Sequence, residues 1–131
     1  MASIFTKIIQ GELPSYKILE NEHVLAILTL DPIQPGHVII FPKVEIDHFL
    51  DVEDPHYAAV FSAAKVVGKA IREATGCKRV GAAVQGFEVP HFHLHLIPMW
   101  STADFDFRNA KRRSPEEMKA AQEKIVAKLK V

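Results

Sequence analysis

The nine residues from Pro90 to Pro98 constrain the fold of this chain more than any other stretch. They read Pro-His-Phe-His-Leu-His-Leu-Ile-Pro, so that His91, His93 and His95 alternate with apolar side chains. Successive side chains of a β-strand point to opposite faces, and a period of two therefore puts the three imidazoles on one face. A helix would scatter them around its circumference. We predict a strand over 90–98 that enters and leaves its sheet at the prolines.

The chemistry of imidazole indicates what such a row of histidines does. Its unperturbed pKa of about 6.5 is near neutrality, so a neutral ring can attack an electrophile and a protonated ring can donate a proton. The row suits nucleophilic or general acid–base catalysis at a phosphate or acyl centre. It also suits a metal ion, because alternate strand residues can deliver two ring nitrogens to one ion. A plain solvent-facing strand is the weakest interpretation, since three histidines alternate strictly.

The run His91–Ile97, His-Phe-His-Leu-His-Leu-Ile, resembles the signature of the histidine triad (HIT) family, His-φ-His-φ-His-φ-φ with φ apolar. Residues 3–14 contain Ser-Ile-Phe-Thr-Lys-Ile-Ile and Gly-Glu-Leu-Pro, similar to the N-terminal segment of that family. Residues 35–43 contain Pro-Gly-His and Phe-Pro-Lys, similar to its second motif. The resemblance implies an α+β fold: an antiparallel sheet of about five strands with a main helix and a C-terminal helix.

The resemblance also implies an activity. HIT hydrolases cleave nucleoside 5′-monophosphate derivatives, phosphoramidates or dinucleoside polyphosphates, at the α-phosphate. The middle imidazole, His93, would attack phosphorus and form a nucleotidyl-histidine that water then releases, which replaces one hard displacement with two easier ones. His91, His95 and His37 would donate hydrogen bonds to the phosphate oxygens as charge develops. This chemistry requires no metal and no other cofactor.

The resemblance implies that apolar residues of the N-terminal segment line the pocket for the nucleotide base. Phe5, Ile8 and Leu13 match the apolar positions that do so in the family. Many members also carry a Cys-x-x-Cys pair for zinc in this segment. This chain has Ser3 and Thr6 at that spacing, and neither hydroxyl is a useful zinc ligand, so we expect no structural zinc.

Glu88 departs from the best-known branch of the family, which has a serine or threonine three residues before the first triad histidine. An ionised carboxylate there would repel a phosphate, unless it is protonated or points elsewhere. We hypothesise that a protonated Glu88 acts as acid to the leaving group. Gly86, nearby in the same loop, would let backbone N–H groups approach the phosphate.

Thr29 is the second departure, because it stands at the place of the ribose-binding Asp of the family. A carboxylate accepts hydrogen bonds from both ribose hydroxyls, which one hydroxyl group cannot do equally well. Asp31 would compensate if the strand continues, since it would then share a face with Thr29. We expect weak discrimination between ribose and deoxyribose unless Asp31 compensates for Thr29. Leu30 lies between the two and is assigned to the same substrate pocket.

Residues 1–131 are expected to form one domain. Helices are predicted over 3–10, 54–75 and from Ser114 onward, strands over 15–20, 23–30, 37–41 and 80–84, and a loop over 101–113. The main helix is expected to be capped by Asp54 and to bury a stripe at three- and four-residue spacing: Tyr57, Val60, Ala64, Val67 and Ile71. The last helix is expected to bury Met118, Ala121, Ile125 and Leu129.

Composition excludes several classes of protein. Sixteen basic and sixteen acidic residues balance, so the chain lacks the positive excess of a nucleic-acid-binding surface. Its apolar runs are shorter than a membrane span, its N-terminus lacks a signal-peptide profile, and its single Cys77 cannot form an internal disulfide. We expect a cytoplasmic protein that binds a nucleotide, no nucleic acid and no membrane. The resemblance implies a homodimer with a continuous sheet.

Three alternatives stay open at this point. The first is a nucleotide-binding regulatory or scaffold protein with little catalysis, which the departures at Glu88 and Thr29 favour. The second is a nucleotidyltransferase of the same fold, whose acceptor is another phosphate instead of water. The third is a metal-dependent protein that uses the three triad histidines together with His37.

Overall fold

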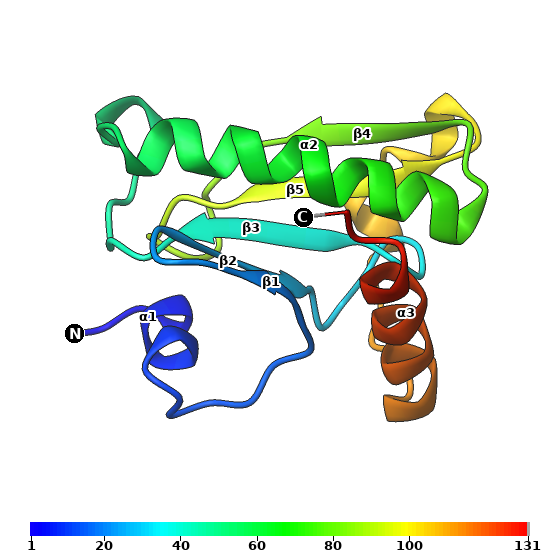
Figure 1. Ribbon diagram of the computed structural model, residues 1–131, viewed down its shortest axis with the longest axis horizontal. Coiled ribbons are helices and arrows are strands. Elements are labelled where there is room, and N and C mark those ends of the chain that lie inside the picture. Colours follow the sequence, from blue (N-terminus) through cyan, green and yellow to red (C-terminus); the bar gives the residue numbers. More distant parts are fainter. Residues whose placement is uncertain (131) are drawn as a thin grey trace.

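The computed structural model describes residues 1–130, which form a five-stranded antiparallel sheet with helices on both faces (Figure 1). The elements are α1 (Ile4–Ile9), β1 (Lys17–Glu20), β2 (Val24–Leu28), β3 (Val38–Pro42), α2 (His56–Thr75), β4 (Arg79–Ala83), β5 (Leu94–Met99) and α3 (Pro115–Ala127). The strand order is β1-β2-β3-β5-β4, and every neighbouring pair is antiparallel. The predicted α+β fold with five strands is therefore confirmed.

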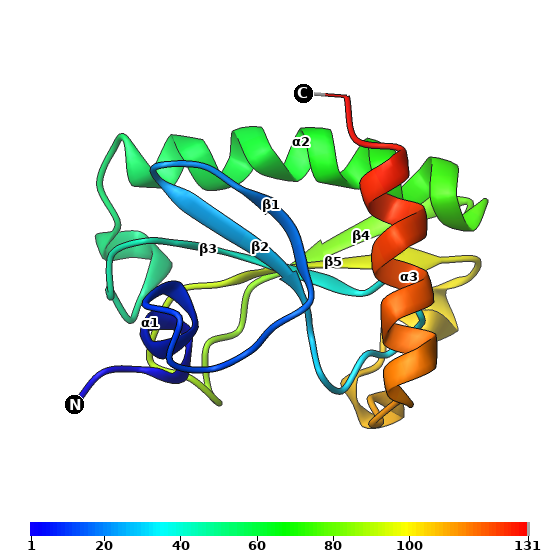
Figure 2. The same cartoon turned by 60° about the horizontal axis from the view of Figure 1, so that its bottom comes forward.

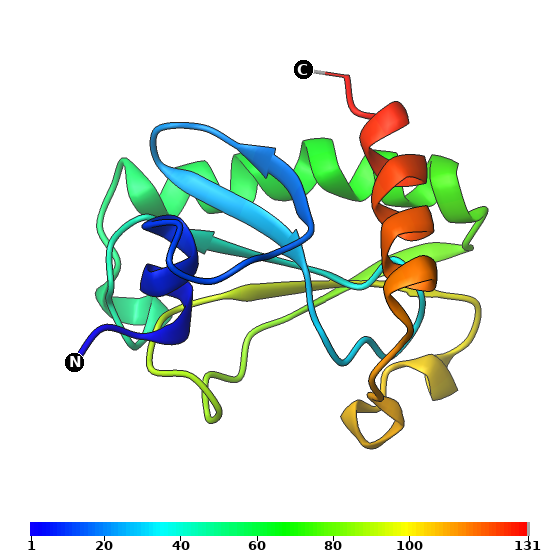
Figure 3. The same ribbon diagram turned by 90° about the horizontal axis from the view of Figure 1, so that it is seen from below.

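Different helices bury the two faces of the sheet, which explains why β2 and β3 have no exposed residue. Alternate side chains, Val24, Ala26, Val38 and Ile40 among them, join α2 and α3 in the larger hydrophobic core. The intervening residues, Leu25, Ile27, Ile39 and Phe41, pack with Phe5 and Ile8 of α1 in a smaller core. Figure 3 gives a second view of α1 and α2 on either side of the strands. Both faces of the central strands are thus apolar, although the sheet is antiparallel.

The main helix α2 ends as predicted but begins at His56, two residues after the predicted start, with Pro55 at the N-cap position. The Asp54 carboxylate accepts a hydrogen bond from the backbone N–H of Ala58 (2.9 Å), and Gly76 ends the helix with φ +72°, a left-handed conformation that glycine adopts without Cβ strain. Its buried residues are Val60, Ala63, Val67, Ala70 and Ile71. Tyr57 is 37% exposed, so the predicted stripe was wrong at its N-terminal end. Within residues 1–130, no helix combines the length and apolarity needed to span a bilayer.

The C-terminal helix α3 covers the β1 edge of the sheet (Figure 2). Its N-terminus is a capping box of Ser114 and Glu117, and Met118 and Ile125 are buried in the larger core, as predicted. The Gln122 side-chain amide donates a hydrogen bond to the backbone carbonyl of β1 residue Lys17 (2.8 Å). Before α3, residues 101–113 form a loop that contains two short 3₁₀ turns.

The triad strand differs from the prediction. β5 begins at Leu94, so His91 and His93 precede it, and it continues through Pro98 to Met99. Pro90 has no N–H to donate, and the N–H of Phe92 bonds to the carbonyl of Ile46 (2.7 Å), outside the sheet. The alternation nevertheless survives, because Phe92 lies in the larger core while the rings of the two histidines contact Phe5. Pro98 is tolerated because β3 pairs with β5 only as far as Leu96.

Candidate active site

A cleft of about 210 Å³ opens on the side of the sheet that carries α1. Residues of α1, of β2 and its exit, of β3 and of the triad segment line it: Ile4, Phe5, Ile8, Pro14, Ser15, Ile27, Leu28, Thr29, Leu30, Asp31, Ile39, Glu88, Val89, His93 and His95. Most of the wall is apolar, and the two imidazoles and two carboxylates supply the ionisable groups. This composition is typical of a small-molecule site, in which a few polar groups orient a ligand among apolar contacts.

The cleft separates the residues assigned from the sequence into two groups. Those that line it are Phe5, Ile8, Thr29, Leu30, Asp31, Glu88, His93 and His95. Those outside its lining are His37, His91, Leu13 and Gly86. Leu13 is 37% exposed, and the neighbouring Pro14 contacts the cleft in its place. Gly86 has φ +75°, which accounts for a glycine at that turn.

Sequence reasoning missed the sheet residues that form the floor of the cleft. Ile39 of β3 lies directly opposite His95 of β5 in the ladder, and opposite residues of an antiparallel pair share a face. Ile27 of β2 lies opposite Ile39 and completes the floor. The period-two pattern of each strand carried this signal, but using it required the register between strands, which the sequence did not specify.

The hydrogen bonds of His93 fix its tautomer. Its Nδ1 atom lies 2.8 Å from the backbone carbonyl oxygen of His91, and since a carbonyl accepts, Nδ1 carries the proton. The lone pair is then on Nε2. The edge of the ring contacts Phe5 (centroids 4.8 Å apart), and Phe5 stacks on Phe41 (4.5 Å). The ring of His93 is thus held in one tautomer, with a lone pair on Nε2 that suits attack on an electrophile.

The contacts of His91 differ from those expected for the role assigned to it from the sequence. It is fully buried and lies outside the cleft. Its Nε2 donates to the carbonyl of Pro42 (2.9 Å), and its Nδ1 accepts from the hydroxyl of Ser3 (2.8 Å). Both ring nitrogens are therefore occupied, and the side chain has no donor left for a phosphate. The contribution of His91 to the site is its backbone carbonyl, which holds the ring of His93.

His37 and His95 form a hydrogen-bonded pair, called here the His37–His95 relay, and His95 lines the cleft. The backbone N–H of Ile33 donates to Nδ1 of His37 (3.0 Å), so His37 carries its proton on Nε2. That proton is donated to Nδ1 of His95 (2.9 Å), and His95 must then carry its own proton on Nε2. Among the described residues, buried Nε2 of His95 has no hydrogen-bond partner. A buried donor without a partner on a residue that lines a cleft fits a ligand oxygen.

Burial keeps these imidazoles neutral. It lowers the pKa of His37 to about 4 and, together with the neighbouring rings of His37 and His93, lowers that of His95 to about 3. Burial also lowers the pKa of His93, while the bond to the His91 carbonyl and the charge of Glu88 partly oppose the shift. At neutral pH the site therefore offers a neutral nucleophile beside a neutral N–H donor.

The structure also locates the two departures from the family pattern. Glu88 is exposed at the cleft, near enough to His93 to affect its pKa. β2 ends at Leu28, so the strand does not continue to Asp31, and the condition for a face shared with Thr29 is not met. Asp31 still lines the cleft with Thr29, but its carboxylate pairs with the guanidinium of Arg112 (2.9 Å).

Comparison with known proteins agrees with this geometry. The HIT domain family model matches residues 10–101. Adenosine 5′-monophosphoramidase HNT1 of Saccharomyces cerevisiae is 35% identical over 98 residues, covering 74% of this chain and 62% of that protein. A solved Hit-like protein involved in cell-cycle regulation from Bartonella henselae superposes with a TM-score of 0.87 at 26% identity, covering 97% of this chain and 96% of that chain.

A second solved structure is similar over nearly the whole chain. The zinc-bound histidine triad family protein from Mycobacterium smegmatis superposes with a TM-score of 0.82 at 25% identity, covering 97% of this chain and 92% of that chain. The matched domain spans well over half of the present sequence and includes the three alternating histidines. The chain therefore belongs to the HIT family.

Proposed function

We propose that this protein hydrolyses nucleoside 5′-monophosphate derivatives, phosphoramidates or dinucleoside polyphosphates, at the α-phosphate. Nε2 of His93 attacks phosphorus, the bond to the leaving group breaks, and a nucleotidyl-histidine forms. Water then attacks the same phosphorus, releases the nucleoside monophosphate and restores neutral His93. The similarity to a yeast protein named as an adenosine 5′-monophosphoramidase supports this substrate class.

One observation carries the proposal: two neutral imidazoles with complementary protonation line the same cleft. His93 carries a lone pair on Nε2, and His95 carries an unpartnered proton on Nε2, their ring centroids being 5.0 Å apart. The first atom suits attack on phosphorus, and the second suits hydrogen bonding to a phosphate oxygen or to the leaving atom as charge develops. This pairing favours nucleophilic catalysis over the metal-dependent alternative, because only two ring nitrogens of the four histidines are uncommitted.

Glu88 is the candidate acid for the leaving group. Its side chain is at the cleft and lies close enough to raise the pKa of His93. Proton donation to a departing amine or phosphate oxygen would complement the attack on the other side of phosphorus. An ionised carboxylate repels a phosphate. The position of Glu88 at the cleft therefore favours a nucleotide-binding regulatory protein as the second candidate function.

Intact-mass analysis after brief exposure to a nucleoside phosphoramidate tests the chemistry and the nucleophile together. A hydrolase gives a nucleotidyl adduct that maps to His93, is absent in His93→Ala and decays in water as monophosphate appears. Decay that requires an added phosphate acceptor would identify a nucleotidyltransferase. Binding of the nucleotide with neither adduct nor turnover would replace the hydrolase by the regulatory protein.

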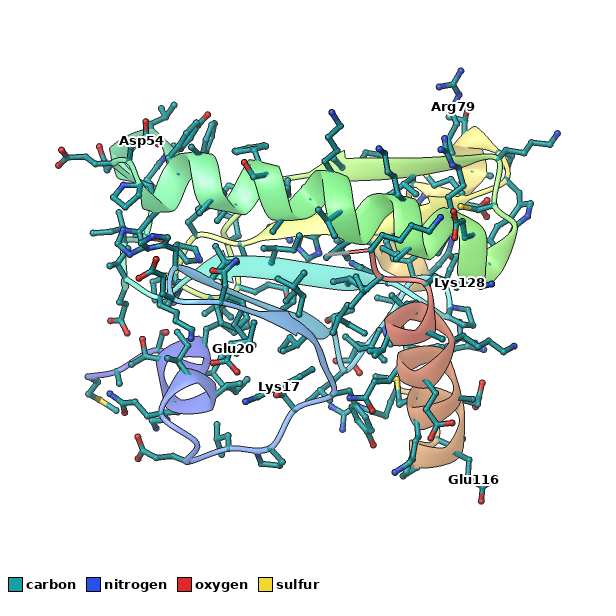
Figure 4. All side chains as sticks on the ribbon, in the orientation of Figure 1. Lys17, Glu20, Asp54, Arg79, Glu116 and Lys128 are labelled. Atoms are coloured by element: carbon teal, nitrogen blue, oxygen red, sulfur yellow. The ribbon has the colours of Figure 1, made fainter. Side chains whose placement is uncertain are left out.

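The assembly is proposed to be a homodimer formed through β4. The chain has two sheet edges, and the Gln122–Lys17 hydrogen bond partly occupies the one at β1. β4 is the other edge, and Arg79 extends outward there, away from Lys17 (Figure 4). An exposed edge can pair with a second copy and continue the sheet. Sedimentation should give a mass twice the 14.7 kDa of one chain. Ala82→Lys places a charge on β4 and should reduce the measured mass toward that of the monomer. Ala120→Lys places the same charge on α3 and should leave the measured mass unchanged.

A further inference from the structure

Four residues that are distant in sequence form one hydrogen-bonded group beside the triad, called here the Glu45 cluster: Ser3, Thr6, Glu45 and His91. Oε1 of Glu45 accepts from the backbone N–H of Ser3 (2.6 Å) and from the hydroxyl of Thr6 (2.7 Å). The Ser3 hydroxyl accepts from the N–H of Thr6 (3.0 Å), which caps α1. The cluster therefore fastens α1 to the chain that follows β3.

The direction of each hydrogen bond in the cluster follows from its partners. Nε2 of His91 donates to the carbonyl of Pro42, so neutral His91 has a lone pair on Nδ1. Ser3 consequently gives its single hydroxyl proton to His91. The carbonyl of His91 accepts in turn from Nδ1 of His93. Hydrogen bonds thus connect the exposed Glu45 to Ser3, Ser3 to the ring of His91, and the backbone carbonyl of His91 to His93.

The cluster occupies the segment where many HIT proteins carry a zinc-binding Cys-x-x-Cys pair, and its donors do not fit that metal. A structural zinc site takes four ligands from thiolates, neutral ring nitrogens and carboxylates. Of these the cluster offers one carboxylate, Glu45, whose Oε1 already accepts two hydrogen bonds. Ser3 and Thr6 offer hydroxyls, whose protons are donated to His91 and to Glu45. Both nitrogens of His91 are also occupied. Within residues 1–130, no group of three or more histidine, cysteine or acidic side chains is arranged to hold a metal ion.

We propose that the Glu45 cluster is a metal-free replacement for this zinc site and that Ser3 and Glu45 are positioning residues for His93. Neither touches the cleft; they act through His91, whose ring is fully buried and whose carbonyl fixes the tautomer of the nucleophile. The same turn of α1 carries Phe5, whose ring contacts the edges of His91 and His93. Anchoring this turn therefore sets both the tautomer and the packing of His93. The kinetic part of this proposal rests on the proposed hydrolase activity.

Matched variants separate positioning from simple loss of stability. Ser3→Ala removes the donor to His91 together with an N-cap, whereas Ser114→Ala removes a comparable N-cap from α3, outside the lining of the cleft. Glu45→Ala removes the acceptor of two hydrogen bonds, whereas Glu45→Gln keeps an oxygen that can accept both. Ser3→Ala should lower kcat by about 10- to 100-fold with KM changed less than about threefold, because the attacking atom is misplaced. Glu45→Gln and Ser114→Ala should stay within about twofold of the parent.

The ring nitrogens of His91 and His93 can be observed by ¹⁵N NMR, which does not depend on turnover. The parent protein should show His93 as the single Nδ1–H tautomer and His91 as the Nε2–H tautomer. Ser3→Ala and Glu45→Ala should give a mixture of tautomers at His93, and treatment with a chelator should leave the parent spectrum unchanged. If both variants keep the single tautomer, or if the parent holds stoichiometric zinc whose removal alters His93, the proposal is wrong. Failure of turnover with the predicted spectra would count against the hydrolase function alone.

Discussion

Nε2 of His37 donates to Nδ1 of His95 across 2.9 Å, although His37 lies outside the cleft. This bond places the proton of neutral His95 on Nε2, since a neutral imidazole carries one ring proton. A histidine outside the cleft thus determines the tautomer of a histidine that lines it. In the same way, the carbonyl of His91 determines the tautomer of His93.

Removal of the relay should impair catalysis more than binding. In His37→Ala, His95 loses the donor that holds its Nδ1 as an acceptor, and its proton can move to the wrong nitrogen. We expect kcat to fall by about 10-fold or more with a small change in KM, measured with a nucleoside phosphoramidate. His48→Ala removes an exposed histidine outside the cleft and serves as the control. Equal kcat values in His37→Ala and His48→Ala would show that the His37–His95 hydrogen bond does not contribute to catalysis.

At acid pH, kcat/KM should fall only below about pH 6.5, the ordinary pKa of histidine. Protonation of His93 removes the lone pair that attacks, and burial lowers the pKa of this ring below 6.5. Activity should therefore be flat from about pH 8 down to about pH 6.5 and fall at lower pH. A profile measured from pH 4 to pH 9 checks this. Loss of activity already between pH 8 and pH 7 would contradict a neutral, buried nucleophile.

The free energy of unfolding should also fall at acid pH, because burial lowers the pKa of histidines in the folded state. The folded-state pKa is about 4 for His37 and about 3 for His95, whereas in the unfolded chain both titrate near 6.5. The unfolded state therefore binds protons first, and stability is retained above about pH 6.5 and lost as pH falls below it. Each histidine should contribute a slope of about 1.4 kcal/mol per pH unit between pH 6 and pH 5. Urea titrations in that window measure it, and His37→Ala should show a shallower slope.

Glu88→Gln should change both the rate and its pH profile. The negative charge raises the pKa of His93, so its removal should move the acid limb to lower pH. If Glu88 is the acid, kcat should fall by about 10-fold or more for a basic amine leaving group and little for an acidic phenol. The two substrates are compared in one assay. An unchanged rate and an unchanged profile would remove Glu88 from the mechanism.

Ribose should be weakly preferred over deoxyribose. Thr29 has one hydroxyl for two ribose hydroxyls, and the carboxylate of Asp31 is paired with Arg112. Thr29→Asp should raise the ratio of kcat/KM for ribo- over deoxyribonucleotides by about 10-fold, since a carboxylate accepts from both hydroxyls. Kinetics with matched substrates measure the ratio. A strong ribose preference in the parent that survives Asp31→Ala would contradict this assignment.

Local patterns in the sequence were enough to predict the order of the helices and strands and the face on which the imidazoles lie. Alternation of three histidines with apolar residues put the imidazoles opposite the core that contains Phe92, Leu94 and Leu96, because this property needs only the local period of two. Spacing of Val60, Val67 and Ile71 likewise placed the buried face of α2. Such patterns are local, and burial of apolar surface enforces them wherever the element packs.

The contacts of each histidine depend on the tertiary structure. His91 appeared equivalent to His95 in the sequence, yet both ring nitrogens of His91 are bonded, to Pro42 and Ser3, while Nε2 of His95 has no partner among the described residues. The start of β5 at Leu94 and the end of β2 at Leu28 were likewise set by contacts between distant segments. A hydrogen bond between residues 88 positions apart depends on sheet register and on where α1 docks, and neither is encoded in a local pattern.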